Sequence, residues 1–208
     1  MAANWIRREF SSVGLTQNPP GPHLRALQAN LTGTVVLMID VSGSMAGERI
    51  RQAVQGARTF VAEAVEAHYR VGVMLWDTRV VALSDPSVDP SGALAVLGAA
   101  HDGGGTSVLG PLVECHALLA PRGGDRVVAL FCDGDLTPVE AVLARVATMR
   151  AEGIRFIVRG LGDAGSGILE RISDEGGDGT TTVATVENLA SGIASMATSL
   201  RSTTAISG

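Results

Sequence analysis

The chain has 208 residues, of which 46% are hydrophobic, and a formal net charge of −5. This length and apolar content fit one sizeable domain, and the acidic balance argues against a nucleic-acid partner, which normally needs a basic patch. All 16 basic residues are arginine, so the sequence also excludes chemistry that needs a lysine amine, such as a P-loop or a Schiff base.

The ends of the chain are weakly patterned. We expect an N-terminal arm over residues 1–32 that packs Trp5 and Phe10 on the body, a domain over residues 33–201, and a flexible tail over residues 202–208. The N-terminus shows no signal peptide, and no stretch has the roughly eighteen apolar residues of a membrane span. We therefore expect a cytoplasmic protein with no membrane partner.

The first half of the domain alternates strands with a helix. Thr34–Ile39 is a β-branched apolar run, typical of a strand buried on both faces, and apolar residues recur at helical spacing from Ile50 to Val65. Arg70–Trp76 and Val80–Ser84 are strand-like runs joined by a connection too short for a crossover helix. They should pair antiparallel, which makes the second an edge strand, with Trp76 half buried at the end of the first.

The second half continues the alternation. The predicted elements are helices Pro90–Leu97 and Ser107–Leu119, strand Arg126–Cys132, helix Val139–Met149, strand Ile154–Val158, helix Gly167–Ser173, strand Thr181–Thr185 and a terminal helix Val186–Leu200. This order predicts an α/β fold with a doubly wound, Rossmann-like, mostly parallel central sheet, one antiparallel edge strand and helices on both faces. Cys115 and Cys132 show no C-x-x-C spacing and are interpreted as buried thiols.

Oxygen-bearing side chains gather in three loops at one predicted edge of the sheet. The loops are Asp40–Ser44 after the first strand, Gly103–Thr106, and Asp133–Asp135 after the strand Arg126–Cys132. In a doubly wound sheet the strands of Asp40 and Asp133 would be neighbours at the switch point, so both carboxylates face one crevice. Carboxylate and hydroxyl oxygens suit a hard divalent cation, and the sequence therefore predicts a metal-centred binding site.

The same three loops resemble a known family. Asp40-Val41-Ser42-Gly43-Ser44 matches the D-x-S-x-S motif of the metal-ion-dependent adhesion site (MIDAS) of von Willebrand factor type A (VWA) domains. Gly103-Gly104-Gly105-Thr106 looks like that family's glycine-rich loop with its threonine, and Phe131-Cys132-Asp133-Gly134 resembles its strand-terminal Asp-Gly. The resemblance covers roughly residues 33 to 200.

The resemblance implies a ligand set and a function. Ser42, Ser44 and Thr106 would supply hydroxyl oxygens, while Asp40 and Asp133 would bind directly or through water. The ion would be Mg²⁺, with Mn²⁺ or Ca²⁺ as alternatives, and a Glu or Asp of a partner protein would complete its shell. The implied protein is an adhesion or scaffold module, not an enzyme, similar to stand-alone bacterial cytoplasmic VWA proteins of ATPase-associated, stress or conflict systems.

Two other interpretations of these residues need no such module. Ser44 could simply be the N-cap of a helix that begins near Glu48. Alternatively, Asp133-Gly134-Asp135-Leu136-Thr137 resembles the nucleophile motif of haloacid dehalogenase-type phosphatases, with Asp133 as the nucleophile and Asp135 as the acid and base. Against the phosphatase, its usual lysine is absent and the Asp40–Ser44 turn stays unexplained. Dinucleotide and serine-hydrolase motifs are absent as well.

Overall fold

The computed structural model describes residues 33–133, 136–161, 166–174, 182–183 and 185–200. The predicted arm over residues 1–32 and the predicted tail over residues 202–208 lie outside the described residues, as does Asp135. The domain boundaries therefore stay predictions.

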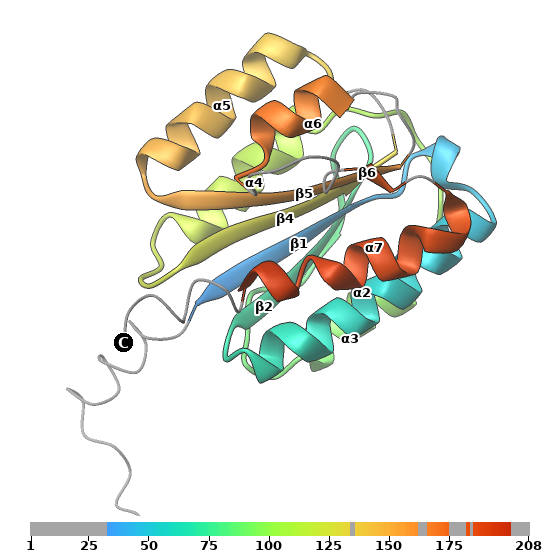
Figure 1. Ribbon diagram of the computed structural model, residues 1–208, viewed down its shortest axis with the longest axis horizontal. Helices are drawn as coiled ribbons and strands as arrows, with labels where there is room; N and C mark the ends of the chain where they lie inside the picture. The colour runs from blue at the N-terminus through green and yellow to red at the C-terminus, as the bar shows by residue number, and fades with distance from the viewer. Residues whose placement is uncertain (1–32, 134–135, 162–165, 175–181, 184, 201–208) are drawn as a thin grey trace, which may run out of the picture.

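A six-stranded sheet in the order β3-β2-β1-β4-β5-β6 forms the centre of the domain (Figure 1). Its strands are β1 Thr34–Asp40, β2 Arg70–Trp76, β3 Val80–Leu83, β4 Arg126–Cys132, β5 Ile154–Leu161 and β6 Thr182–Val183. All neighbouring pairs are parallel except β2 and β3, which pair antiparallel at the edge. The predicted mostly parallel sheet with one antiparallel edge strand is confirmed.

Helices cover both faces of the sheet, as predicted. They are α2 Glu48–Glu66, α3 Ser91–Gly98, α4 Leu109–Leu119, α5 Val139–Ala151, α6 Ser166–Ile172 and α7 Leu189–Ser195, with the short 3₁₀ turns η1 Gly43–Met45 and η2 Val186–Asn188. Helices α2, α3 and α7 lie on one face, and α4, α5 and α6 lie on the other (Figure 1). The predicted terminal helix is divided, because η2 precedes α7 and α7 ends at Ser195.

Strand β1 is buried along its whole length because it separates two apolar clusters. Val35, Leu37 and Ile39 pack toward α2, α3 and α7, whereas Val36 and Met38 pack toward α4, α5 and α6. Successive side chains of a strand point to opposite faces, so a continuous β-branched run fills both layers at once. This burial fixes the backbone that ends at the candidate site.

Burial at the end of β2 differs from the prediction. Trp76 is fully buried rather than half buried, because it joins the cluster that contains Val108 and Leu112 beside α4. The two thiols agree with the prediction, since Cys115 and Cys132 are both buried and free.

The topological switch point lies between β1 and β4. The chain leaves β1 for α2 on one face and leaves β4 for α5 on the other, so the connections diverge at the carboxyl ends of these strands. Ile39 pairs with Phe131, which sets Asp40 level with the end of β4 and brings it close to Asp133. Open α/β sheets bind their ligands in this position.

Among the described helices, none combines the length and the apolar character needed to cross a membrane.

Candidate metal site

Asp40 lies at the base of the site, where β1 ends. Its side chain is fully buried, Oδ1 accepts a 2.8 Å hydrogen bond from the Ser42 backbone N–H, and Oδ2 has no hydrogen-bond partner in the described part of the chain. Burial raises the pKa of Asp40 to about 6; the hydrogen bonds from Ser42 oppose this rise and the charge of Asp133 adds to it. A buried carboxylate oxygen without a donor is costly, so this position favours a positively charged ligand.

Two serine hydroxyls connect the turn to the end of β4. The Oγ atoms of Ser42 and Ser44 lie 3.0 Å apart, and the Ser44 hydroxyl donates a 2.9 Å hydrogen bond to Asp133 Oδ1. Because Ser44 has only one hydroxyl hydrogen, Ser42 is the donor in the serine pair. The structure therefore brings four predicted site residues, Asp40, Ser42, Ser44 and Asp133, into one hydrogen-bonded cluster.

The interpretation of Ser44 as a helix N-cap is wrong. Ser44 lies within η1, and α2 begins at Glu48 with Gly47 as its N-cap, at a φ of 75°. This left-handed conformation is easily adopted only by glycine, and it separates the serine turn from the helix. The Ser44 side chain is thus available to the site rather than to the helix.

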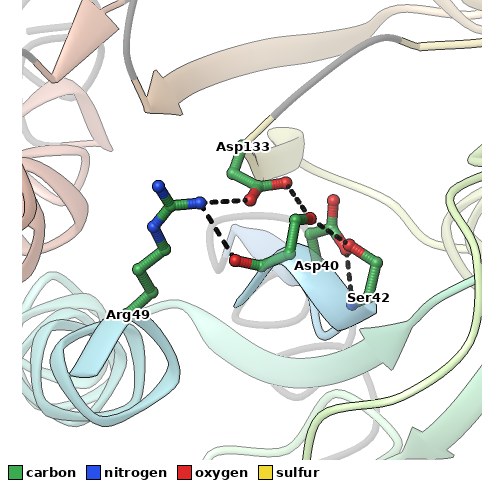
Figure 2. Close-up of polar contacts among 5 residues, drawn as sticks. Asp40, Ser42, Arg49 and Asp133 are labelled. Carbon is green, nitrogen blue, oxygen red and sulfur yellow. Dashed lines mark hydrogen bonds and ion pairs between the residues drawn. The ribbon is translucent and has the colours of Figure 1, made fainter. Parts of the chain in front are cut away.

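Arg49 contacts the site from the first turn of α2. Its Nη1 donates to Asp133 Oδ2 at 3.2 Å and to the Ser44 carbonyl at 3.0 Å (Figure 2). The Asp133 side chain is only 3% exposed, whereas that of Arg49 is 42% exposed. Both oxygens of Asp133 are therefore occupied, one by a hydroxyl and one by a guanidinium, while Asp40 Oδ2 stays without a donor.

The glycine-rich loop packs against the serine turn through the backbone. The Gly103 N–H donates to the Val41 carbonyl at 3.0 Å, and the Gly43 N–H donates to the Gly104 carbonyl at 3.2 Å. Gly104 has a φ of 76°, so the loop needs glycine here for its conformation. These bonds hold the loop beside the carboxyl ends of the strands, which is the position predicted from the sequence.

Thr106 lies in this loop, but its hydroxyl makes no hydrogen bond with the other four predicted ligands within the described residues. The loop is fixed just beyond it, where the Ser107 N–H donates to the Asp77 carbonyl at 3.0 Å. The carboxylate of Asp77 also lies where a Cβ on Gly104 would stand. The structure thus places Thr106 near the site through its backbone, and its role as a ligand stays a prediction.

The donor set fits a hard divalent cation. The side chains that meet are carboxylates and hydroxyls, and no cluster of three or more His, Cys, Asp or Glu is found in the part of the chain that the structure describes. The buried, unpartnered oxygen of Asp40 belongs to a cluster that also contains Asp133 and two hydroxyls. Oxygen ligands of this kind suit Mg²⁺, Mn²⁺ or Ca²⁺.

Sequence reasoning missed Arg49. One signal could have found it: Arg49 is the second residue of a 19-residue helix, where a cation opposes the helix dipole. A charge in such a position needs a compensating partner, and here the partner is Asp133.

A known family matches part of the chain. Residues 35–135 match the sequence model of the von Willebrand factor type A domain. A comparison with curated protein sequences finds no match.

Solved structures show the same fold at low identity. The vWF domain of the type V pili tip protein Mfa5 from Porphyromonas gingivalis matches with a TM-score of 0.69 and 14% identity, over 84% of this chain and 96% of that chain. The pilus adhesin SpaC from Lactobacillus rhamnosus GG matches with a TM-score of 0.66 and 15% identity, over 83% of this chain.

A third structure similar in fold is proximal thread matrix protein 1 from the mussel byssus, with a zinc-occupied MIDAS motif, at a TM-score of 0.65, 15% identity and 83% of this chain. The match spans 30% of the SpaC chain and 46% of the byssus protein. Residues 35–135 therefore match the von Willebrand factor type A domain in sequence, and the described domain shares the fold of these proteins.

Proposed function

We propose that this VWA domain is a metal-dependent protein-binding module. Its ligands for Mg²⁺, or for Mn²⁺ or Ca²⁺, are Asp40, Ser42, Ser44, Thr106 and Asp133. The observation that carries the proposal is Asp40 Oδ2, a fully buried carboxylate oxygen with no donor among the described residues, in the cluster that also includes Asp133. A cation is the ligand that removes both the desolvation cost and the repulsion between the two acids.

The roles of the residues follow from their contacts. Asp40 and Asp133 supply negative charge from two adjacent buried strands, and Ser42 and Ser44 supply neutral oxygens between them. When bound, the dication would supply a Lewis-acidic position for a Glu or Asp carboxylate of the partner protein. The serine hydroxyls orient Asp133, and the Ser42 backbone N–H orients Asp40.

The comparisons support the proposal at the level of the family. One protein of similar fold carries zinc in a MIDAS motif, and another is a pilus adhesin. Binding of this kind needs no nucleophile and no turnover. A cytoplasmic location and a bacterial ATPase-associated, stress or conflict system stay predictions from the sequence.

Thermal unfolding with and without a divalent cation tests the proposal. We expect MgCl₂ or MnCl₂, each against EDTA, to raise the melting temperature of the wild type. A ligand at 100 times its Kd stabilises by about 2.7 kcal/mol. Asp40→Ala and Ser42→Ala should abolish the rise, and Thr106→Ala should reduce it.

Ser191→Ala is a matched control, because it also removes a serine hydroxyl, but from an exposed position on α7. It should keep the full metal-dependent rise. If neither ion shifts the wild-type melting temperature, the metal site is contradicted.

A phosphatase assay tests the rival use of Asp133. Both oxygens of this carboxylate are already hydrogen-bonded, by Ser44 and by Arg49, which does not favour a free nucleophile. We expect no hydrolysis of p-nitrophenyl phosphate. Turnover that disappears in Asp133→Asn but survives in Asp40→Ala would support the phosphatase instead.

A further inference from the structure

Arg49 is a charged residue of the site that the ligand set does not include. It stands in the first turn of α2, where the helix dipole disfavours a cation, and its Nη1 bonds Asp133 Oδ2 and the Ser44 carbonyl. The geometry of α2 alone therefore gives no reason for an arginine here. Its contacts are with the candidate metal site.

Part of the Arg49 guanidinium is not used in contacts with the described residues. Only Nη1 bonds to other described residues, and 42% of the side chain is exposed, so Nε and Nη2 keep donors for a group outside the domain. A guanidinium matches the planar fork of a carboxylate, which is the group the proposed partner offers. Arg49 thus contacts an acid of the site (Figure 2) and is itself partly exposed to the solvent from which a partner's acid would come.

Charge arithmetic gives Arg49 two opposite effects. The two carboxylates of the site carry −2 and a divalent cation carries +2, which leaves the loaded site neutral without the arginine. With Arg49 the loaded site carries +1 and attracts an anion. Without metal, the same charge already neutralises Asp133 and repels an incoming cation.

We propose that Arg49 sets the balance of affinities at this site: it weakens binding of the metal and strengthens binding of the partner's carboxylate. The proposal rests on the metal-dependent function proposed above and names the residue that gives that site its preference for an acidic partner. Arg49 acts as a positioning and charge-balancing residue for the incoming acid, not as a metal ligand.

Two titrations on the full chain test this balance. Calorimetric titration with MnCl₂ measures metal affinity. Acetate affinity comes from paramagnetic relaxation of the acetate methyl protons, with the protein in excess over Mn²⁺. For Arg49→Met we expect Mn²⁺ to bind about tenfold more tightly and acetate severalfold more weakly than in the wild type. Arg49→Lys keeps the charge and should restore Mn²⁺ affinity to near the wild-type value.

Arg51→Met is the matched control, because it removes the same charge from the same turn of α2. Arg51 pairs with Glu48 rather than with a residue of the site, and its side chain is 73% exposed. Both affinities should stay within about twofold of the wild type.

The outcomes separate the two proposals. If the wild type binds no Mn²⁺, the metal-dependent function and the role of Arg49 both fail. If the wild type binds Mn²⁺ but Arg49→Met behaves like Arg51→Met, only the role of Arg49 fails. A loss of both Mn²⁺ and acetate binding in Arg49→Met also overturns it, since damage to the site and not charge would then be the cause.

Discussion

Strand β4 carries an aspartate just beyond each of its ends, and each aspartate pairs with an arginine. At the amino end, Asp125 accepts hydrogen bonds from Arg155 Nε at 2.9 Å and Nη2 at 2.6 Å, and a third from the Tyr69 hydroxyl at 2.5 Å. At the carboxyl end, Asp133 receives one guanidinium nitrogen of Arg49 and one serine hydroxyl. At the amino end, both oxygens of the acid are bonded by an arginine. At the carboxyl end, Asp133 adjoins a second acid, Asp40, that has no cation partner among the described residues.

The pKa shifts at the two ends run in opposite directions. Burial alone would raise the pKa of Asp125, but the hydrogen bonds and charge of Arg155 and the bond from Tyr69 outweigh it, so its pKa is lowered. Asp40 receives no such cation, and burial raises its pKa to about 6. The difference separates an ion cluster that stabilises the fold from one that is suited to binding a further charge.

The largest effect expected from this comparison is the pH dependence of the metal-free domain. Folded Asp40 keeps its proton up to about pH 6, whereas the unfolded chain releases it near 3.8, so the folded state binds more protons between these values. Stability in EDTA should therefore fall as pH rises through this window, by about 3 kcal/mol from this group.

Urea unfolding of the wild type and of Asp40→Asn, from pH 4 to pH 7 in EDTA, measures this contribution. The free energy of unfolding of the wild type relative to the variant should decrease with rising pH. A relative stability that is flat or rises with pH would show that Asp40 is not destabilised by burial.

The amino-end cluster should respond to mutation but not to metal. Asp125→Asn removes the charge that pairs with Arg155, and we expect a loss of about 2 kcal/mol, discounted because both side chains are partly exposed. The lowered pKa of Asp125 means that its contribution is present above about pH 4 and is lost as pH falls below 3.8. Urea unfolding at pH 7 and at pH 3 measures both statements.

The Mg²⁺-dependent rise in melting temperature serves as the control for Asp125→Asn. It should equal that of the wild type, because Asp125 stands at the opposite end of β4 from Asp133. If Asp125→Asn also loses the metal-dependent rise, the two ends of β4 are not independent, and the comparison is contradicted.

The smallest expected effect belongs to Tyr69. Tyr69→Phe removes the hydroxyl that bonds Asp125 and the Leu200 carbonyl, while it keeps the ring that packs against Gly33. Because Arg155 still holds Asp125, we expect a loss of about 1 kcal/mol in urea unfolding. A loss of stability as large as that of Asp125→Asn would show that the tyrosine hydroxyl supplies most of the stabilisation of this cluster.

Much of the fold could be predicted because its signals are local. The apolar runs that became β1 and β4 each end in an acid, and a doubly wound order of strands makes these two neighbours. That reasoning predicted from the sequence alone that Asp40 and Asp133 lie close together. The serines followed from the motif between strand and helix.

The remaining features depend on tertiary packing and on the reach of long side chains, which the spacing of residues along the sequence does not encode. Trp76 is fully buried because α4, distant in sequence, covers the end of β2. Arg49 was missed because its long side chain turns back from α2 to a residue 84 positions away. The helix begins at Glu48, near the predicted position, but its N-cap is Gly47 and not Ser44, because of a backbone conformation that hydrophobic periodicity cannot show.

The central place of β1 also has a mechanical consequence. Asp40 is the last residue of a strand that is hydrogen-bonded to β2 on one side and to β4 on the other. A pull on a partner bound at Asp40 would load β1 along its axis, so the two flanking ladders would share the force in shear. Breaking the strand out would require many hydrogen bonds to fail together, which makes this edge of the sheet a strong point of attachment under tension.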